Sequence, residues 1–260
     1  MKVLSIDLDY IMGPSDYMYR HVGWHNHPFI RWDMFYKTTD YKKEELLYDV
    51  NRLNFIKRLF FKSVKECKNV KFGYEHDSIL YHIKDYDSVD LLNIDHHDDV
   101  LMNDYGYFDN DIDNFEAEYL HIQKYNKVDE GCWIGWLNQK DKLKSLTWIG
   151  NQDSISDEKQ DYISSIISDY KFVCDDFNSY LTDFKFDYIF VCLSPQYIPP
   201  HHWNIMNWFI DTYEHLAKTK VDLAEWDSKK FEINYRYKEV SDAILHKCAN
   251  DWEPVFGEGI

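Results

Sequence analysis

Residues 70–99 read VKFGYEHDSILYHIKDYDSVDLLNIDHHDD, and this stretch decides the fold. Its hydrophobic pattern predicts a short strand at 70–74, a helix at 77–85 and an apolar strand at 89–94. A strand, a helix and a second strand in succession are typical of a βαβ unit on a parallel sheet. The stretch therefore predicts an α/β protein.

The alternation of strands and helices continues on both sides of this stretch. We expect further strands at 2–9, 146–149, 172–174 and 188–193, and helices at 42–68, 131–142, 158–168, 202–218 and 237–250. Segments 10–37 and 103–114 lack a clear period and are expected to be loops. Because there is no internal repeat and no change of composition, we expect residues 1–260 to form a single domain. It should have three layers, α/β/α, around a mainly parallel central sheet.

The chain carries a large excess of acid. Its 29 lysines and arginines face 46 aspartates and glutamates, which gives a formal net charge of −17. A field of this sign repels phosphate backbones, so the charge disfavours nucleic acid and favours metal ions, guanidinium groups or basic peptides as partners. Solubility alone explains the acid excess equally well.

Cysteine content and the start of the chain bear on the compartment. The five cysteines are scattered, odd in number and without C-x-x-C spacing, which favours buried thiols in a reducing compartment. The first residues show no basic region followed by an apolar one, and no apolar run approaches the roughly 20 residues that span a bilayer. We expect a cytoplasmic protein without a membrane segment.

Acidic and histidine side chains follow the strand predicted at 89–94. The segment DHHDD, residues 95–99, places five consecutive ionisable groups at a buried strand end, which is costly unless a cation compensates them. In extended backbone Asp95, His97 and Asp99 point the same way. Two carboxylates and an imidazole suit Mn²⁺ or a similar ion. A solvated acidic turn is the alternative.

Two further segments also end predicted strands. The segment SIDLD, residues 5–9, puts Asp7 and Asp9 on one strand face, where adjacent carboxylates either bridge metal ions or raise a pKa; a polar edge strand is the alternative. The segment GYEHDS, residues 73–78, offers His76 at a helix start, where a histidine is more often structural than a ligand. Because ligands of parallel sheets bind beyond the carboxyl ends of the strands, residues from these segments can converge.

Together the three segments resemble the signatures of the ureohydrolase family, the arginases and agmatinases. That family has three characteristic segments. Residues 95–99 match its Asp-Ala-His-x-Asp segment, and residues 5–9 match its Ser-x-Asp-x-Asp segment. Residues 73–78 match its Gly-Gly-Asp-His-Ser segment loosely. The resemblance implies an arginase/deacetylase-like fold and two Mn²⁺ ions, although other divalent cations are compatible with it. The implied ligands are His76, Asp95, Asp99 and Asp7 for one ion, and Asp95, His97, Asp7 and Asp9 for the other.

The order of the segments differs from that of typical arginases, in which the Ser-x-Asp-x-Asp segment comes last. In this chain the Ser-x-Asp-x-Asp segment comes first and the chain is short, and in both respects the sequence resembles the divergent peptide arginases. These enzymes convert arginine side chains of precursor peptides into ornithine. The segments EGCW at 130–133 and LSPQYIPP at 193–200 add to this similarity. The resemblance thus implies a hydrolase that acts on an arginine-containing peptide, or alternatively on free arginine or agmatine, and releases urea.

Two positions depart from the pattern of typical arginases. Typical arginases have a His-Gly pair that acts as proton shuttle, and Glu130 stands at the position of its histidine. Glu130 is expected either to carry the proton or to be only an acid at a helix start. His121 is the alternative proton shuttle. Gln196 stands where a glutamate grips the guanidinium, so Asp16 or Asp175 is an alternative group for that task.

Substrate contacts are expected from aromatic and histidine residues around the site. Trp24, Trp32 or Trp133 can hold a cationic side chain through cation–π contacts. His25 and His27 are expected to contact substrate or to pack within their loop. A separate metal site at these two histidines is disfavoured for want of a third ligand.

Three other interpretations remain. A deacetylase on the same fold would use a single zinc ion held by two aspartates and one histidine, so the number of bound ions separates it from an arginase. A non-catalytic binding protein is disfavoured because a disused site is expected to lose ligands. A calcium-binding scaffold is disfavoured because Ca²⁺ prefers shells made only of oxygen.

Overall fold

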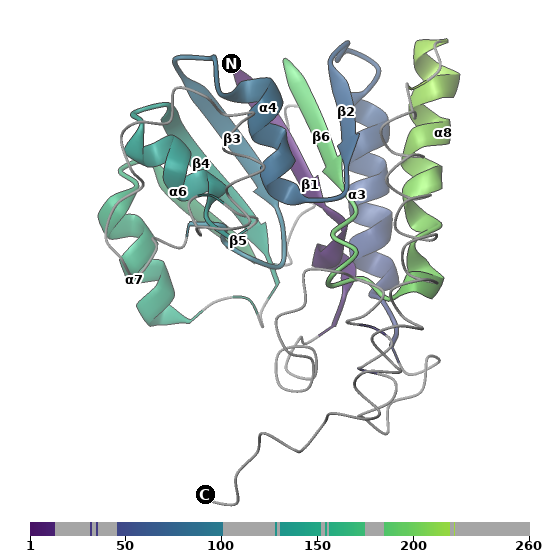
Figure 1. Ribbon diagram of the computed structural model, residues 1–260, viewed down its shortest axis with the longest axis horizontal. Helices are drawn as coiled ribbons and strands as arrows, with labels where there is room; N and C mark the ends of the chain where they lie inside the picture. Colours follow the sequence, from purple (N-terminus) through teal and green to yellow (C-terminus); the bar gives the residue numbers. More distant parts are fainter. Residues whose placement is uncertain are drawn as a thin grey trace, which may run out of the picture.

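Six strands of the described residues form one sheet, all of them parallel, in the order β2-β6-β1-β3-β4-β5 (Figure 1). The structure is a computed structural model that describes residues 1–13, 46–100, 131–151, 156–174 and 185–218, with Trp32, Phe35, Val128, Ser154 and Val221. The strands are β1 (Lys2–Asp7), β2 (Val70–Gly73), β3 (Val89–Ile94), β4 (Leu143–Gly150), β5 (Tyr170–Cys174) and β6 (Tyr188–Cys192). The α-helices are α3 (Val50–Ser63), α4 (Leu80–Ile83), α6 (Trp133–Gln139), α7 (Asp157–Ile166) and α8 (Ile205–Ala217), and the 3-10 helices are η1 (Leu8–Ile11), η3 (His76–Ile79) and η4 (Pro200–His202).

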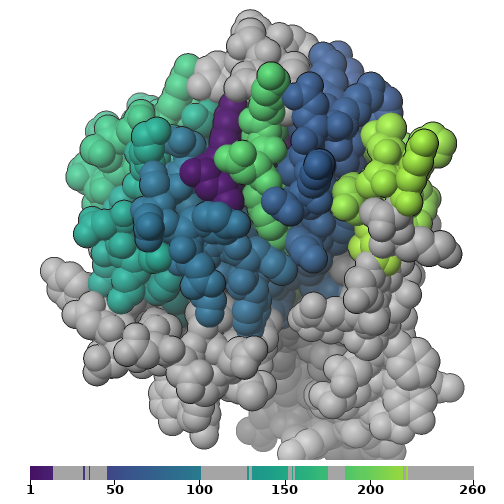
Figure 2. Space-filling view, turned by 90° about the horizontal axis from the view of Figure 1, so that it is seen from above, coloured from purple at the N-terminus to yellow at the C-terminus, as the bar shows by residue number. Residues whose placement is uncertain are grey.

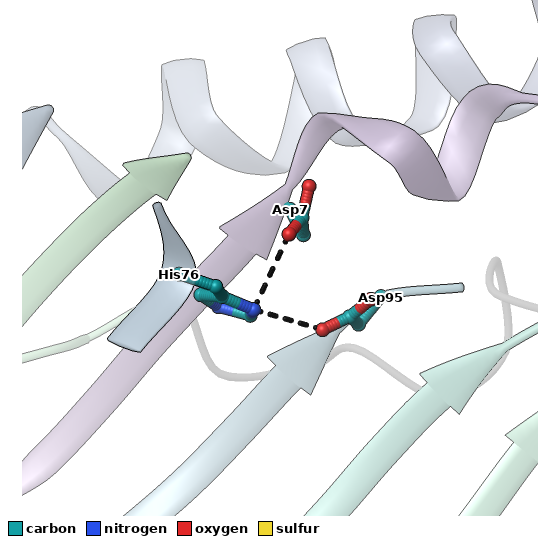
Figure 3. Close-up of side chains that lie close together, drawn as sticks. All are labelled: Asp7, His76 and Asp95. Atoms are coloured by element: carbon teal, nitrogen blue, oxygen red, sulfur yellow. Dashed lines mark ion pairs between the residues drawn. The ribbon is translucent and has the colours of Figure 1, made fainter. Parts of the chain in front are cut away.

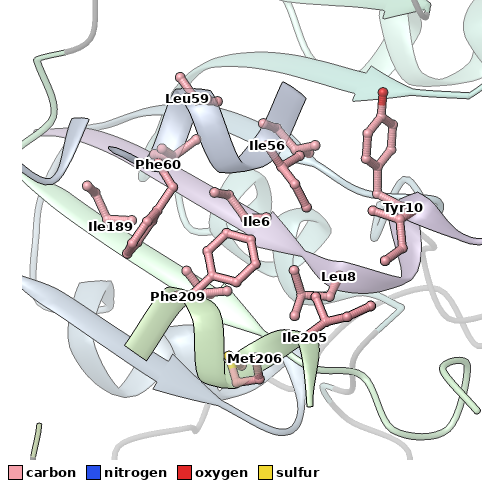
Figure 4. Close-up of a cluster of buried hydrophobic side chains, with 14 of the residues drawn as sticks. Ile6, Leu8, Tyr10, Ile56, Leu59, Phe60, Ile189, Ile205, Met206 and Phe209 are labelled. Carbon is pink, nitrogen blue, oxygen red and sulfur yellow. The ribbon is translucent and has the colours of Figure 1, made fainter. Parts of the chain in front are cut away.

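Helices cover both faces of this sheet. Helices α3 and α8 pack on one face, and α4, α6 and α7 pack on the other (Figure 1). The core under α3 and α8 contains Ile6, Ile56, Phe60 and Phe209, with the last two rings edge to face at 5.1 Å (Figure 4). The protein is therefore a three-layer α/β/α fold with a parallel central sheet, which confirms the fold class predicted from the sequence.

The alternation of side chains along β1 decides which groups reach which face. Leu4 and Ile6 belong to the core under α3 and α8, whereas Val3 packs with residues of α4 and α6. Asp7 follows Val3 by an even number of positions, so its carboxylate lies on the face of α4 and α6, where it meets His76.

Strand β1 lies in the middle of the sheet although it begins the chain. It pairs with β6 on one side and with β3 on the other, so that Leu4 lies opposite both Ile189 and Leu92. Seen from above, β1 (purple) and β6 (green) lie side by side in the middle of the molecule (Figure 2). The chain leaves β1 toward β2 and leaves β3 toward β4, in opposite directions. Such a switch point is where open α/β sheets bind ligands, beyond the carboxyl ends of the strands.

Side-chain caps explain where two of the helices start. The carboxylate of Asp49 accepts hydrogen bonds from the N–H groups of Asn51, at 2.7 Å, and Arg52, at 3.1 Å, at the start of α3. The hydroxyl oxygen of Ser156 accepts one from the N–H group of Lys159, at 3.3 Å, at the start of α7. Each cap satisfies backbone donors that the first turn of a helix leaves unpaired.

The boundaries of several elements differ from those predicted. The helix predicted over 42–68 is too long, because Asp49 caps α3 and residues 46–49 precede it in non-helical backbone. The strand predicted over 2–9 ends at Asp7, where η1 begins. The helix predicted over 77–85 consists of η3 followed by α4, and β4 and β5 begin earlier than predicted.

Some predicted elements lie outside the described residues. They are the loop at 103–114, the helix at 237–250 and most of the loop at 10–37. Within the described ranges, no helix is both long and apolar enough to cross a membrane.

Candidate metal centre

Six acidic and histidine side chains meet at the carboxyl ends of β1, β2 and β3. Two come from β1 and η1, one from the start of η3 after β2, and three from the segment after β3. They are Asp7, Asp9, His76, Asp95, His97 and Asp99. The structure thus brings together every residue that the resemblance implies as a metal ligand.

Three carboxylates surround the Nδ1 atom of His76. Its distances are 2.8 Å to Asp99 Oδ2, 2.9 Å to Asp95 Oδ2 and 3.3 Å to Asp7 Oδ2. Figure 3 shows the imidazole between Asp7 and Asp95, and all four side chains are buried. Two donor atoms that share an ion at about 2.1 Å lie roughly 3 Å apart, so these spacings fit a common cation. We call these four residues the inner group.

A second set of donors forms around His97, and it shares Asp95 with the inner group. His97 Nδ1 lies 2.9 Å from Asp9 Oδ2 and 3.8 Å from Asp95 Oδ1. We call Asp9, Asp95 and His97 the outer group, because the His97 side chain is 25% exposed. Asp95 presents Oδ2 to the inner group and Oδ1 to the outer group, as a bridging carboxylate does. Donor atoms of Asp7, His76 and Asp95 in the inner group, and those of all three residues in the outer group, lie close enough to hold a metal ion.

Hydrogen bonds alone do not account for this arrangement. His76 Nε2 lies 2.6 Å from Ser5 Oγ, but the buried Nδ1 has no partner in hydrogen-bond geometry among the described residues. One proton on Nδ1 cannot satisfy three carboxylates. Asp9 Oδ2 is buried and lacks such a partner as well, despite its approach to His97. Buried polar atoms in this state need compensation, which a bound cation would supply.

Donors from the protein fix the orientation of the carboxylates. Asp7 accepts hydrogen bonds from the hydroxyl of Ser194 and, at 3.0 Å, from the N–H group of Asp9. Asp95 Oδ1 accepts one from the N–H group of His97 at 2.7 Å. Because each carboxylate oxygen has two lone pairs, these bonds orient the groups and still leave lone pairs for a metal ion.

Burial and mutual repulsion shift the pKa values in the cluster. Burial, reinforced by neighbouring aspartates, raises the pKa of Asp7, Asp9 and Asp99 well above the usual range. Burial acts in the same sense on Asp95, but the imidazole of His76 outweighs it and keeps that pKa well below the usual range. Burial would lower the pKa of His76, yet the carboxylates, chiefly Asp95, raise it. Without a cation the cluster therefore holds protons that a cation would displace.

Asp7 and Asp9 reach the cluster from a tight turn. Strand β1 ends at Asp7, and η1 carries Asp9. The prediction that the two carboxylates share one strand face is therefore wrong, because the chain turns between them. The turn still delivers both side chains to the cluster, with the N–H group of Asp9 bonded back to Asp7.

The side chains of His96 and Asp98 form contacts outside the cluster. Nδ1 of His96 pairs with the amide of Asn151 at 2.7 Å, and burial lowers the pKa of this histidine to about 3. Asp98 forms an ion pair with Lys159. The assumed extended backbone is wrong, however: the segment lies beyond the end of β3, and Asp99 has a left-handed φ of 53°.

The predicted role of two tryptophans in substrate binding needs correction. Trp133 is fully buried, and its indole N–H donates to Asp99 Oδ2 at 2.6 Å. Trp32 is buried as well, and its indole N–H donates to the carbonyl of Pro195 at 2.8 Å. The expected cation–π contact with a substrate is wrong for both, because neither ring has an exposed face.

Gln196, the predicted guanidinium contact, lies in a segment whose neighbouring residues contact the cluster. It follows Ser194, which bonds to Asp7, and precedes Tyr197, whose ring packs on His97 with centroids 4.6 Å apart. Gln196 is buried, and its Oε1 atom has no hydrogen-bond partner among the described residues. Gln196 thus offers a buried acceptor, and its contact with a guanidinium stays a prediction.

The remaining predicted site residues lie outside the described residues. They are Asp16, Trp24, His25, His27, His121, Glu130 and Asp175. The identity of the proton shuttle stays a prediction for this reason.

Three polar residues that support the cluster were not recognised from the sequence. Ser194 follows β6 and adopts a φ of 46° in bonding to Asp7. Asn93, buried within β3, donates to Asp95 Oδ2 at 3.3 Å, and Ser5 orients His76. Each is a polar residue in or directly after an apolar strand, which is the signal that could have identified it.

Comparison of the chain with protein-family models, with curated proteins and with solved structures found no match. The geometry stands on its own: buried aspartates and histidines lie at metal-binding distance from one another. They occupy the carboxyl ends of central strands, at the switch point of a parallel sheet. The cluster is a candidate metal site.

Proposed function

We propose that this protein is a hydrolase with two metal ions, of the ureohydrolase type, which converts arginine residues of a peptide into ornithine and releases urea. The shared carboxylate of Asp95 carries the proposal, with Oδ2 2.9 Å from His76 Nδ1 and Oδ1 3.8 Å from His97 Nδ1. Catalytic sites with two ions place them close together, where one carboxylate can contact both.

The donor set favours manganese or a similar ion. Carboxylate with imidazole suits Mn²⁺, whereas an all-oxygen shell would favour Ca²⁺. The inner group would hold one ion and the outer group, with Asp7, the other. Bound there, the ions would supply Lewis-acid catalysis and activate water near neutral pH.

Residues around the ligands prepare them for this role. Ser5 Oγ lies 2.6 Å from Nε2 of His76 and can accept its proton in the tautomer that a metal ligand needs, with the Nδ1 lone pair toward the carboxylates. Ser194 and the N–H group of Asp9 hold the carboxylate of Asp7 in place. The ligands are thus oriented before a cation arrives.

The substrate is proposed to approach from the side of His97, the most exposed of the six donor residues. The net charge of −17 favours a cationic group there. The Oε1 atom of Gln196, which has no hydrogen-bond partner among the described residues, would accept a hydrogen bond from the guanidinium. A proton relay by Glu130 completes the proposal.

The inner group favours two ions over the single zinc of a deacetylase. A site with one zinc ion held by two aspartates and one histidine needs only the outer group. His76 and Asp99 would then have no purpose, yet their donor atoms lie 2.8 Å apart in a buried site. The Ser-x-Asp-x-Asp segment comes first in this chain, and this order resembles that of the peptide arginases. The resemblance favours a peptide substrate over free arginine or agmatine.

Mass spectrometry tests the proposed reaction. The Mn²⁺-loaded protein is incubated with an arginine-containing peptide, free arginine and agmatine. Wild-type protein should remove one CH₂N₂ unit from the peptide, and Asp95→Asn should remove none. The matched control is Asp90→Asn, the same change at the other end of β3, which should stay active.

The contradicting result is a wild-type protein with bound metal that alters none of the three substrates. A peptide with an acetylated lysine would then be the next substrate, since the deacetylase interpretation predicts its hydrolysis.

A further inference from the structure

Trp133 occupies a place in the cluster that the proposed hydrolysis leaves unexplained. Its indole N–H donates to Asp99 Oδ2 at 2.6 Å from a fully buried position. The same ring lies against the imidazole of His76, with centroids 5.0 Å apart and planes at 59°. One side chain therefore touches two of the four residues of the inner group.

Backbone hydrogen bonds tie Trp133 and Asp99 together a second time. The carbonyl oxygen of Asp99 accepts from the N–H groups of Ile134, at 3.0 Å, and Gly135, at 3.3 Å. Helix α6 begins at Trp133, so its first turn is bonded to the backbone of Asp99 while its first side chain is bonded to the carboxylate. These bonds leave the carboxylate little freedom to move relative to the helix.

The indole hydrogen bond also decides how Asp99 faces the inner group. Oδ2 lies 2.6 Å from the indole nitrogen and 2.8 Å from His76 Nδ1, so one lone pair is engaged while the oxygen still faces the other donors. An indole N–H is a neutral donor, so it orients the carboxylate without adding a positive charge that would repel a cation. Removal of such a supporting donor typically weakens metal binding about 10- to 100-fold.

We infer that Trp133 is a positioning residue that sets the affinity of the inner group for its divalent cation. The inference rests on the proposed function, because that proposal assigns a cation to each group. Trp136 provides the matched control. It lies in the same helix and is equally an interior tryptophan, but its indole nitrogen has no hydrogen-bond partner among the described residues.

The test compares Mn²⁺ binding by full-length wild-type, Trp133→Phe and Trp136→Phe proteins. In calorimetric titrations, Trp133→Phe should weaken one of two binding steps about ten-fold or more, while Trp136→Phe leaves both unchanged. In electron paramagnetic resonance spectra at equal Mn²⁺, Trp133→Phe should show more isolated ions and less of the exchange-coupled pair. Circular dichroism of the metal-free proteins verifies that each variant is folded.

A second variant keeps the test decisive if the loss of the large ring disturbs packing. Asp99→Ala removes the carboxylate that accepts from the indole but leaves the ring in place. If Trp133 acts through Asp99, the combined change Trp133→Phe/Asp99→Ala should bind Mn²⁺ as Asp99→Ala alone does. A further loss in the combined variant would show that Trp133 acts through general packing, and would overturn the inference.

Two other results would overturn the inference: unchanged binding by Trp133→Phe, or equal weakening in both tryptophan variants. Failure of the proposed function has a different signature, namely a wild-type protein that binds a single ion. The affinities of the Trp133→Phe and Trp136→Phe proteins for that single ion would still decide the role of Trp133. A wild-type protein that binds no ion would overturn both.

Discussion

Gly73 shows how a single residue connects packing to the candidate metal site. A Cβ atom built on this glycine would lie 2.5 Å from Cζ of Phe190 and 2.8 Å from Oγ of Ser78. The Phe190 ring in turn lies parallel to the imidazole of His76, with centroids 6.3 Å apart. A methyl group at Gly73 must therefore displace a ring that packs against a proposed metal ligand.

We predict that Gly73→Ala lowers the free energy of unfolding by about 1–3 kcal/mol, the usual cost of inserting a methyl group into a packed interior. Mn²⁺ binding should weaken at the same time, because the displaced ring shifts His76. Urea denaturation and metal titration measure the two effects. Gly13→Ala is the control, since a Cβ atom there meets nothing within 4 Å. Equal stability of the two variants would contradict the prediction.

The residue types of the site could be predicted from the sequence, whereas their supporting contacts could not. Asp95, His97 and Asp99 stand out because ionisable groups directly follow an apolar strand, and this pattern can be read along the sequence. The contact between Trp133 and Asp99 joins two segments that the sequence alone does not place side by side. An aromatic residue near an acidic site suggests a cation–π contact equally well, so its buried role emerged only from the fold.

At the scale of elements, helix α3 has a role in holding η1, which carries Asp9. The N–H group of Asp49 donates to the carbonyl of Ile11 at 2.8 Å, and Met12 forms a β-bridge with Tyr48. The same Asp49 caps α3 through its side chain. One residue thus fixes the start of the helix and the end of the turn that delivers a carboxylate.

We predict that Asp49→Ala destabilises the protein by about 1 kcal/mol, because two backbone donors of α3 lose their acceptor. Chemical denaturation of the metal-free protein measures this difference. Asp161→Ala serves as the control: it removes an exposed carboxylate inside α7, where alanine is the better helix former. It should leave stability unchanged or slightly higher. The prediction fails if both variants unfold at the same denaturant concentration.

Element types were predicted more successfully than element ends. Apolar runs such as the one at 188–193 report burial in a parallel sheet, which depends on composition over several residues. Ends depend on single hydrogen bonds. The periodic pattern continues upstream of Asp49 through Leu46, yet the cap starts the helix later. The turn after Asp7 likewise depends on a bond from one N–H group, which no periodicity reveals.

At the scale of the whole molecule, charge and protonation couple metal binding to pH. The pKa values of Asp7, Asp9 and Asp99 are raised in the metal-free protein, chiefly by burial, so these groups retain protons to higher pH than ordinary aspartates. A cation must displace those protons. Apparent affinity should therefore rise with pH until the three carboxylates are fully ionised, and fall as the pH drops below their raised pKa values.

We predict that Mn²⁺ binding releases protons, and that the binding enthalpy therefore differs between buffers of different ionisation enthalpy at one pH. Calorimetry in two such buffers gives the number of protons released. Asp9→Asn, which has no carboxyl proton to release, should release fewer. Identical binding enthalpies in both buffers would show that the carboxylates are already ionised, contrary to the prediction.

The position of β6 between β1 and β2 has a consequence for the biosynthesis of the protein. A nascent chain leaves the ribosome with β1 and β2 first, and the strand that must separate them is the last of the six to be made. Asp7 belongs to β1 and His76 follows β2, so neither can take its final place relative to the other until β6 has inserted. A metal ion held between these residues would then be acquired late, after the synthesis of most of the chain. Until that point the growing polypeptide exposes unpaired strand edges, which are prone to aggregate.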